Sequence, residues 1–285
     1  FIETGPTVQI RYSGIRNGFT RAFGDSDPEV TYSGPLAVLV NRTSASASEI
    51  FAGAIQDYQR GIVLGGQTFG KGTVQEIIPM DFGQVKVTRS KFYRISGAST
   101  QHRGVIPDIT FPDFYDAYDD IGESSLDGAL PWDTVRPVEY RPYFSIQAIL
   151  PQLREKHELR AEESPDFIYL LDQIERTRKY RNREQLSLNE SQVKAERERN
   201  RREEFDAENM RRFLKGLPLN EWAEEDDLNV DEDEESSIAN NESLASDEEE
   251  DEADPLLLES GRILADFILL NGRRLSAIDR LPESR

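Results

Sequence analysis

A long acidic segment near the end of the chain prevents the whole sequence from folding around one core. Residues 221–254 contain 18 Asp or Glu and no Lys or Arg. The 285-residue chain has 54 acidic and 34 basic residues, so the remainder holds 36 acids against 34 bases. So many like charges with so few apolar residues cannot offset the entropy that ordering costs. The sequence therefore predicts a disordered acidic linker over residues 223–254, flanked by nearly neutral folded parts.

The composition excludes several kinds of site. The chain has no Cys and two His, so we expect no disulfide, no Cys-ligated metal and no multi-histidine metal site. It also lacks a run of about 18 apolar residues, the length that a membrane-spanning helix needs. Its net charge of −20 argues against nucleic-acid binding, because phosphates are neutralised by clustered bases. No metal or cofactor is expected.

Residues 1–115 have the pattern of an α/β domain. The apolar run 35–40 predicts a strand buried on both faces, and residues 61–64 predict a second one. A strand, a helix and a strand in this order predict a βαβ crossover. Residues 73–80 and 84–95 predict further strands. The helix between the first two strands, residues 48–58, has an apolar face made by Ile50, Phe51, Ala54, Ile55 and Tyr58.

The chain beyond residue 115 predicts a connection and then helices. Residues 116–143 are rich in Pro and predict a loop, and residues 144–222 predict a helical domain. Within that domain, residues 192–215 are so charged that we expect an exposed helix with ion pairs between residues four apart. His157 lies in the charged stretch Lys156-His-Glu and is expected to be solvated.

Residues 255–285 predict an amphipathic helix and a tail. Charged residues interrupt its apolar face, so we expect it to dock onto a domain rather than enter a bilayer. The apolar face is formed by Leu257, Leu264, Phe267 and Ile268, and the interrupting residues are Glu259, Arg262 and Asp266.

Two polar segments near the predicted crossover contain residue types that are suited to catalysis. Ser44, Ser46 and Ser48 alternate with Ala in the turn that leads from a strand into the helix. Backbone N–H groups of a first helical turn are unpaired and carry the positive end of the helix dipole, so they could stabilise an oxyanion. The second segment places Lys71 between two Gly residues after the next strand. A serine nucleophile from the first segment and a lysine base from the second would form a catalytic pair.

The same residues also fit purely structural roles or a phosphate-binding loop. Ser46 and Glu49 have the spacing of a capping box, and Lys71 has the position of an ordinary turn lysine. Gly65, Gly70 and Lys71 fit part of a phosphate-loop pattern, but Gly72 replaces its Ser or Thr and no helix follows.

Two further polar patterns are weaker. His102 could pair with a serine, but nothing near it forms a nucleophile elbow. Residues 231–242 have acids at calcium-loop positions 1, 3, 5 and 12, but Ser236 stands where Gly is needed. We therefore interpret this pattern as part of the solvated acidic linker.

The segment from residue 40 to 75, with Ser-Ala-Ser-Ala-Ser-Glu and Thr-Phe-Gly-Lys-Gly-Thr-Val-Gln, resembles the carboxy-terminal processing proteases, or tail-specific proteases, of peptidase family S41. The resemblance continues through residues 99–108 and covers about 5–114. The helical region is similar, less specifically, to the C-terminal helical domain of the long periplasmic forms of gamma-proteobacteria. The resemblance implies a crotonase-like α/β spiral in residues 1–115, followed by an α-helical domain.

The same resemblance implies serine endopeptidase activity with a Ser–Lys dyad. Ser46 matches the nucleophile, Lys71 the general base and Gln75 the residue that orients the lysine, while the N–H of Ala47 matches an oxyanion donor. A free lysine has a pKa of about 10.4 and is protonated at neutral pH.

A working base therefore needs a less polar environment. We expect Phe69 and Val74 to bury the Lys71 ammonium and lower its pKa. Contact of the ammonium with Glu49 or Glu76 would have the opposite effect and would silence the base.

The resemblance also implies partners and a location. It implies protein substrates with apolar C-terminal tails, among them penicillin-binding proteins and peptidoglycan hydrolases, and a lipoprotein adaptor. The implied location is the periplasm, with association to the inner membrane. The chain begins at Phe1 without a signal-peptide pattern, and residues 7–12 already predict a strand, so we expect it to begin inside a folded domain.

The family pattern has an upstream half with a PDZ domain and a second oxyanion donor. We therefore expect this chain alone to lack activity. The alternative function is a non-catalytic helical binding or scaffold module derived from such a protease.

Overall fold

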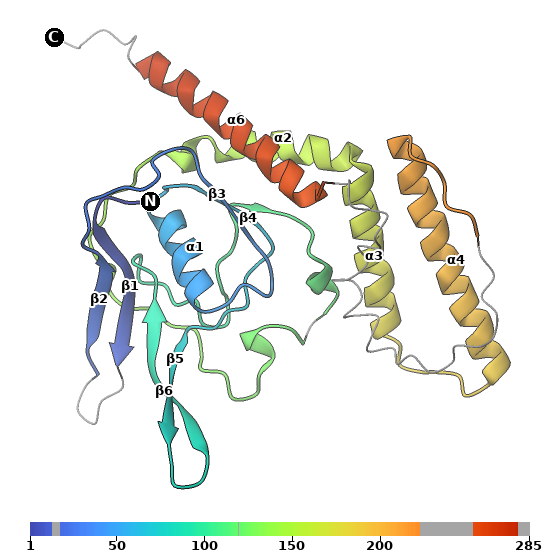
Figure 1. The fold of residues 1–285 in the computed structure, drawn as a ribbon, viewed down its shortest axis with the longest axis horizontal. Coiled ribbons are helices and arrows are strands. Elements are labelled where there is room, and N and C mark those ends of the chain that lie inside the picture. Colours follow the sequence, from blue (N-terminus) through green and yellow to red (C-terminus); the bar gives the residue numbers. More distant parts are fainter. Residues whose placement is uncertain (13–17, 119, 223–252, 279–285) are drawn as a thin grey trace.

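The chain forms a mixed α/β part followed by helices, as predicted (Figure 1). The computed structural model describes residues 1–12, 18–118, 120–222 and 253–278, with side chains up to residue 272. The predicted calcium-loop pattern and, apart from residues 253 and 254, the predicted acidic linker lie outside the described residues.

A small parallel sheet holds the predicted βαβ unit. Strands β3 (Ala37–Val40) and β4 (Ile62–Gly65) are parallel neighbours joined through α1 (Ala47–Asp57), and β7 (Ile109–Thr110) pairs with the other side of β4. All of β4 is buried, as expected. The prediction for β3 is wrong on one face, since Leu39 is 42% exposed.

The predicted apolar face of α1 is mostly correct, with Ile50 half-buried. Ala54, Ile55 and Tyr58 are buried, whereas Phe51 is exposed. The buried side of the helix also includes Ala52, which packs with residues of β3 and β4.

A second, antiparallel sheet has the strand order β2-β1-β6-β5. It consists of β1 (Gly5–Tyr12), β2 (Thr20–Asp25), β5 (Thr73–Pro79) and β6 (Gln84–Tyr93). The far halves of β5 and β6 extend away from the rest of the molecule as a two-stranded ribbon (Figure 1). Short 3-10 helices lie in the following connection: η1 (Phe114–Ala117), η2 (Glu123–Ser125) and η3 (Ile146–Ala148).

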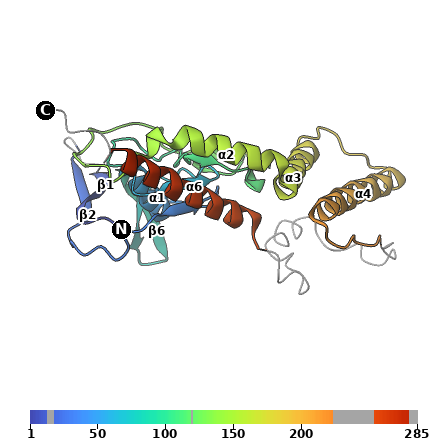
Figure 2. The same ribbon diagram turned by 90° about the horizontal axis from the view of Figure 1, so that it is seen from above.

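Four long helices follow in the described residues, namely α2 (Leu150–Glu163), α3 (Pro165–Arg181), α4 (Glu190–Lys215) and α6 (Pro255–Ile278). The prediction for α4 is confirmed, since none of its residues is buried and ion pairs link residues four apart. Figures 1 and 2 show α4 beside α3 and away from both sheets. None of the described helices combines the length and apolar character needed to cross a membrane.

The last helix, α6, completes the core around the parallel sheet. It lies beside α2 in both views (Figure 2). Ile263 and Phe267 are buried in one cluster with Ile62 and Leu64 of β4. Docking of this helix onto a domain is therefore confirmed. The predicted face is partly wrong, because Leu257 and Ile268 are exposed.

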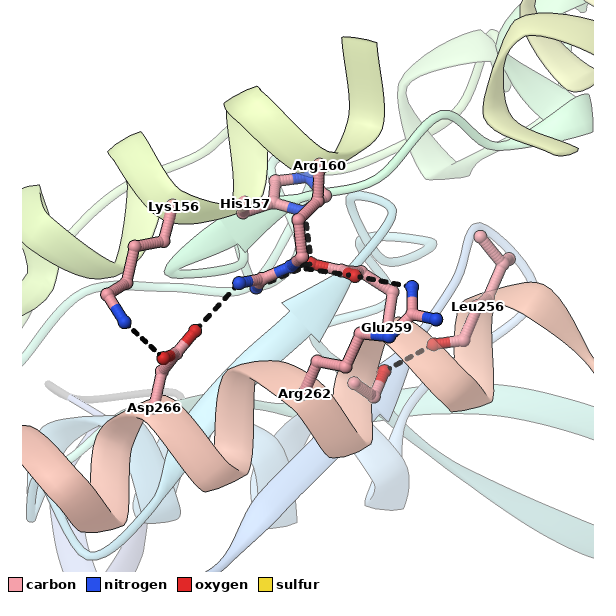
Figure 3. Close-up of polar contacts among 8 residues, drawn as sticks. Lys156, His157, Arg160, Leu256, Glu259, Arg262 and Asp266 are labelled. Atoms are coloured by element: carbon pink, nitrogen blue, oxygen red, sulfur yellow. Dashed lines mark hydrogen bonds and ion pairs between the residues drawn. The ribbon is translucent and has the colours of Figure 1, made fainter. Parts of the chain in front are cut away.

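Charged residues on α6 form part of its docking face (Figure 3). Arg160 of α2 donates hydrogen bonds to Glu259 and Asp266, at 2.8 Å in each case, and Lys156 pairs with Asp266. The Nδ1 atom of His157 lies 3.0 Å from Glu259. The acids that interrupt the apolar pattern are thus matched by bases on α2, which local periodicity cannot show.

The prediction of a solvated His157 is wrong. The residue is 6% exposed, and its ring lies 5.0 Å from that of Phe111 and 5.7 Å from that of Phe167. The residues next to it in sequence are charged, but the helix that covers it comes from about a hundred residues later in the chain. His157 is therefore buried by tertiary packing, which its neighbours in sequence do not indicate.

Contact between α2 and α6 should weaken in acid. Burial raises the pKa of Glu259, but hydrogen bonds from His157 and Arg160 outweigh this and lower it; Lys156 and Arg160 do the same for Asp266. A carboxylate with a lowered pKa stabilises the folded state above its unfolded pKa and loses that contribution as the pH falls through its folded pKa.

We expect the stabilising effect of these acids to disappear as the pH falls from about 5 towards 2. The measurement is the free energy of unfolding of wild type and Glu259→Gln in urea at each pH. Their difference should shrink in acid, whereas Glu158→Gln, an exposed change on α2, should show no such trend. A Glu259→Gln difference that stays constant over this range would contradict the prediction.

Candidate active site

Ser46 lies in a strained turn directly before α1. It is the N-cap residue of that helix and has φ 58° and ψ −110°. A positive φ is costly for a residue with a Cβ, and such strain is common at functional sites. A serine on a strained strand-to-helix turn is the geometry of a nucleophile elbow. The local structure thus suits a nucleophile, although it also places Ser46 at an ordinary capping position.

A buried carboxylate joins this turn to the loop that contains Lys71. Glu49 is 0% exposed, and its Oε2 accepts hydrogen bonds from the N–H groups of Ser46 (2.8 Å) and Lys71 (3.0 Å). Its Oε1 accepts hydrogen bonds from the N–H of Gly70 (2.7 Å) and the hydroxyl of Thr68 (2.6 Å). The backbone nitrogens of Ser46 and Lys71 therefore lie within about 6 Å of each other, since both contact one oxygen.

The hydrogen bonds to Glu49 limit what else it can bind. Burial raises the pKa of this carboxyl, and the hydrogen bonds from Thr68, Gly70, Ser46 and Lys71 act against that rise. A carboxylate has about four acceptor positions, and four donors occupy them. Glu49 therefore binds the backbone of Lys71 and has no acceptor left for its ammonium.

The sequence indicated only part of the role of Glu49. The capping-box interaction from Glu49 to the Ser46 N–H is present. The link to the second segment was missed, because the pattern of Ser46 and Glu49 does not show which loop will lie above it. The available signal was the Gly-Lys-Gly run, whose N–H groups need acceptors once the loop is buried.

Lys71 is half-buried. Val74 is exposed, so the expectation that it helps to bury the ammonium is wrong, while Phe69 is half-buried. Over the described ranges, the Lys71 ammonium has no hydrogen bond or ion pair. It is therefore not held by Glu49 or Glu76.

Gln75 lies on β5 and Ala47 begins α1, and the roles expected of both stay predictions. Gln75 is exposed on β5 next to an irregularity in the pairing with β6. In the part of the chain that the structure describes, its side chain makes no hydrogen bond to Lys71. Ala47 is the exposed first residue of α1, where a backbone N–H has no acceptor within the helix.

The two glycines around Lys71 are required by close packing. A Cβ on Gly70 would lie 2.9 Å from the His102 carbonyl, and one on Gly72 would lie 2.7 Å from the Gln101 nitrogen. The Gln101 side chain accepts a hydrogen bond from the Gly72 N–H at 2.8 Å and donates one to Glu123 at 2.8 Å. Because protein side chains use the N–H groups of residues 70–72, the phosphate-loop interpretation is wrong.

His102 does not form part of a triad in this structure. It lies in a turn with φ 65°, and its N–H donates to the Gly70 carbonyl at 2.9 Å. Its Nε2 is buried and has no hydrogen-bond partner within the described residues. The contact with Ser46 that a Ser–His pair requires is therefore not present.

Two family models match successive parts of the chain. The model of peptidase family S41 matches residues 1–111. The model described as the C-terminal domain of tail specific protease matches residues 117–269, which is more than half of the chain.

Individual relatives agree with these matches. A tail-specific protease of Haemophilus influenzae is 42% identical over 208 residues, covering 69% of this chain and 29% of that protein. A carboxy-terminal-processing protease of Bartonella bacilliformis is 41% identical over 134 residues, covering 45% of this chain and 30% of that protein. The solved photosystem II D1 C-terminal processing protease is 33% identical, with a TM-score of 0.35, covering 39% of this chain and 28% of that one.

The chain thus spans less than a third of the length of these relatives. Both family models nevertheless agree with the relatives on one assignment, and together they account for the α/β part and most of the helical part. The chain belongs to the tail-specific proteases of peptidase family S41.

Proposed function

We propose that this chain supplies the catalytic dyad of a serine endopeptidase, with Ser46 as nucleophile and Lys71 as general base. The observation that carries the proposal is the Glu49 carboxylate, which ties the strained Ser46 turn to the Lys71 loop. This contact brings together two segments that are 25 residues apart in sequence. It also leaves the Lys71 ammonium unpaired within the described residues, as a base requires.

The proposed reaction proceeds through an acyl-enzyme. Neutral Lys71 takes the proton of the Ser46 hydroxyl while Oγ bonds to the peptide carbonyl carbon, and the N–H of Ala47 stabilises the oxyanion. The carbon–nitrogen bond then breaks, and Lys71 returns the proton to the leaving amine. A water molecule attacks the resulting ester and gives its proton to Lys71, which passes it to Ser46 as the ester bond breaks. Gln75 orients the lysine without adding a charge.

We also propose the substrates and location that the family resemblance implies. The name tail-specific protease, carried by the relative from Haemophilus influenzae, supports recognition of a C-terminal tail, which we take to be apolar. The proposed substrates are cell-envelope proteins such as penicillin-binding proteins and peptidoglycan hydrolases. The proposed location is the periplasm, next to the inner membrane, with a lipoprotein adaptor bound to the helical domain.

Labelling with a fluorophosphonate tests the nucleophile in the natural full-length protein. We expect the label on Ser46, and Ser46→Ala should lose both labelling and peptide cleavage. Ser48→Ala removes an exposed hydroxyl two residues away and serves as the matched control, which should keep both. Unchanged cleavage by Ser46→Ala would disprove the assignment. Absence of labelling in wild type, with retained substrate binding, would instead support the non-catalytic scaffold.

A further inference from the structure

The outer edge of β5 is an unpaired row of backbone groups that begins beside the candidate active site. In the described part of the antiparallel sheet, β5 is the last strand in the order β2-β1-β6-β5. It begins at Thr73, two residues after Lys71, and continues to Pro79. Figure 1 shows its far half within the projecting ribbon rather than against another element.

The register of the ribbon identifies which groups point outwards. Met80 donates its N–H to Gly83 across the turn, and the pairs Ile78 with Val85 and Glu76 with Val87 follow at alternate positions. Hydrogen-bonded pairs alternate in an antiparallel ladder, so these residues direct their N–H and C=O groups towards β6. The N–H and C=O groups of the residues between them, together with the C=O of Pro79, therefore point to the open edge. Those residues are Gln75 and Ile77.

Apolar side chains accompany this open edge. Ile77 is 57% exposed, and Ile78, Met80 and Val85 are also exposed. Phe82 at the turn is 98% exposed. Proteins usually protect such an edge with charges, proline or a covering element, because it pairs readily with another chain. Here Pro79 protects the end farthest from Lys71. The one charge on β5, Glu76, pairs with Arg89 of β6 at 3.0 Å, so the outward main-chain groups of Gln75 and Ile77 stay open in the described sheet.

We propose that the edge of β5 binds the polypeptide to be cleaved as an added β-strand. This inference rests on the proposed function and names how that site holds its substrate. We infer this occupant because the open edge is continuous with the candidate active site. The first outward groups belong to Gln75, which is four residues from Lys71, a distance of at most about 14 Å of extended chain. A peptide paired from Pro79 to Gln75 is therefore led towards the dyad.

The chemistry of this edge defines the class of substrate. Main-chain groups recognise any extended backbone, while alternate side chains of the bound strand meet Ile77 on one face of the sheet or Ile78 on the other. The preferred substrate is therefore an unfolded segment with apolar residues at every second position. A folded helix or a tight turn cannot pair with it.

An edge-blocking variant tests the pairing in the natural full-length protein. Ile77→Pro removes the outward N–H but no hydrogen bond to β6, so proline is tolerated there. Ile77→Thr keeps the N–H and removes only the apolar side chain, which makes it the matched control. With an internally quenched peptide of alternating leucines, we expect kcat/KM to fall about tenfold for Ile77→Pro, mainly through KM, and less for Ile77→Thr. Labelling of Ser46 by the small fluorophosphonate should change less than twofold, as it needs no strand pairing.

An ester scan of the substrate tests the same idea without altering the enzyme. Each non-scissile amide of the peptide is replaced in turn by an ester, which removes one N–H donor. Strand pairing predicts slower cleavage at every second position, because alternate N–H groups face β5. A flat scan, or wild-type kcat/KM in a folded Ile77→Pro variant, would overturn the inference. So would a protein dimer that Ile77→Pro dissociates without changing cleavage, since the edge would then bind a second copy. Failure of Ser46 labelling in wild type would instead reject the proposed function.

Discussion

Lys71→Arg is expected to abolish peptide cleavage as completely as Lys71→Ala does. Arginine keeps the positive charge, the length and the donors of lysine, but its guanidinium is not deprotonated in proteins. It therefore cannot accept the Ser46 proton. Loss of one member of a catalytic unit costs nearly as much as loss of the whole unit, so kcat should fall by a factor of about 10⁴ or more in both variants. The measurement is steady-state cleavage of a quenched peptide by the natural full-length protein.

The arginine variant separates a base from a fixed charge. Activity retained in Lys71→Arg but lost in Lys71→Ala would show that the charge alone matters, against the proposed mechanism. Lys86→Arg, an exposed change on the β5–β6 ribbon, controls for general effects of the substitution. The ammonium of the half-buried Lys71 makes no hydrogen bond or ion pair within the described ranges. The free energy of unfolding should therefore change by only about 0.5 kcal/mol in Lys71→Arg.

Phe267→Ala should destabilise the protein by about 3–5 kcal/mol, the usual cost of removing a buried aromatic ring. The ring is 1% exposed and packs in the cluster that joins α6 to the parallel sheet and to α2. It also meets the ring of Phe144 edge-on at 5.9 Å. Truncation would leave a cavity in this cluster, because the surrounding side chains come from several elements that cannot all move inwards.

The neighbouring position supplies a matched control for this prediction. Ile268 is also apolar and lies on the same turn of α6, but it is 47% exposed. Ile268→Ala should therefore cost less than about 1 kcal/mol in urea unfolding of the natural full-length protein. Equal losses at the two positions would contradict the observed orientation of α6 and favour the face expected from the sequence.

The sequence predicted those elements that are specified locally. The apolar runs of β3 and β4, the periodicity of α1 and the charge pattern of α4 all lead to the observed elements. The failures occur where distant segments decide the outcome. Leu39 is exposed although it lies in a continuous apolar run, and the burial of His157 follows from the return of α6. No local pattern contains either fact.

In the candidate site, too, residues in local motifs could be predicted, whereas residues far apart in the sequence could not. Ser46 and Lys71 were identified through motifs, and in the structure their backbone N–H groups both donate hydrogen bonds to the Glu49 carboxylate. The roles of Gln101 and Glu123 in holding the Gly72 N–H could not be predicted, since they lie far beyond it in the chain and form no recognisable motif. Val74 was expected to shield the lysine, but it is exposed on β5.

The docking of α6 has a consequence for synthesis of the protein. The segment that fills the core against β4 and α2 is made after every other described element. A growing chain therefore holds the apolar surface of Ile62, Leu64 and Leu153 uncovered until residues 255–270 leave the ribosome. An incomplete product would keep that surface open and would be a target for chaperones and quality-control proteases. The order of synthesis thus delays completion of this core until α6 has been made.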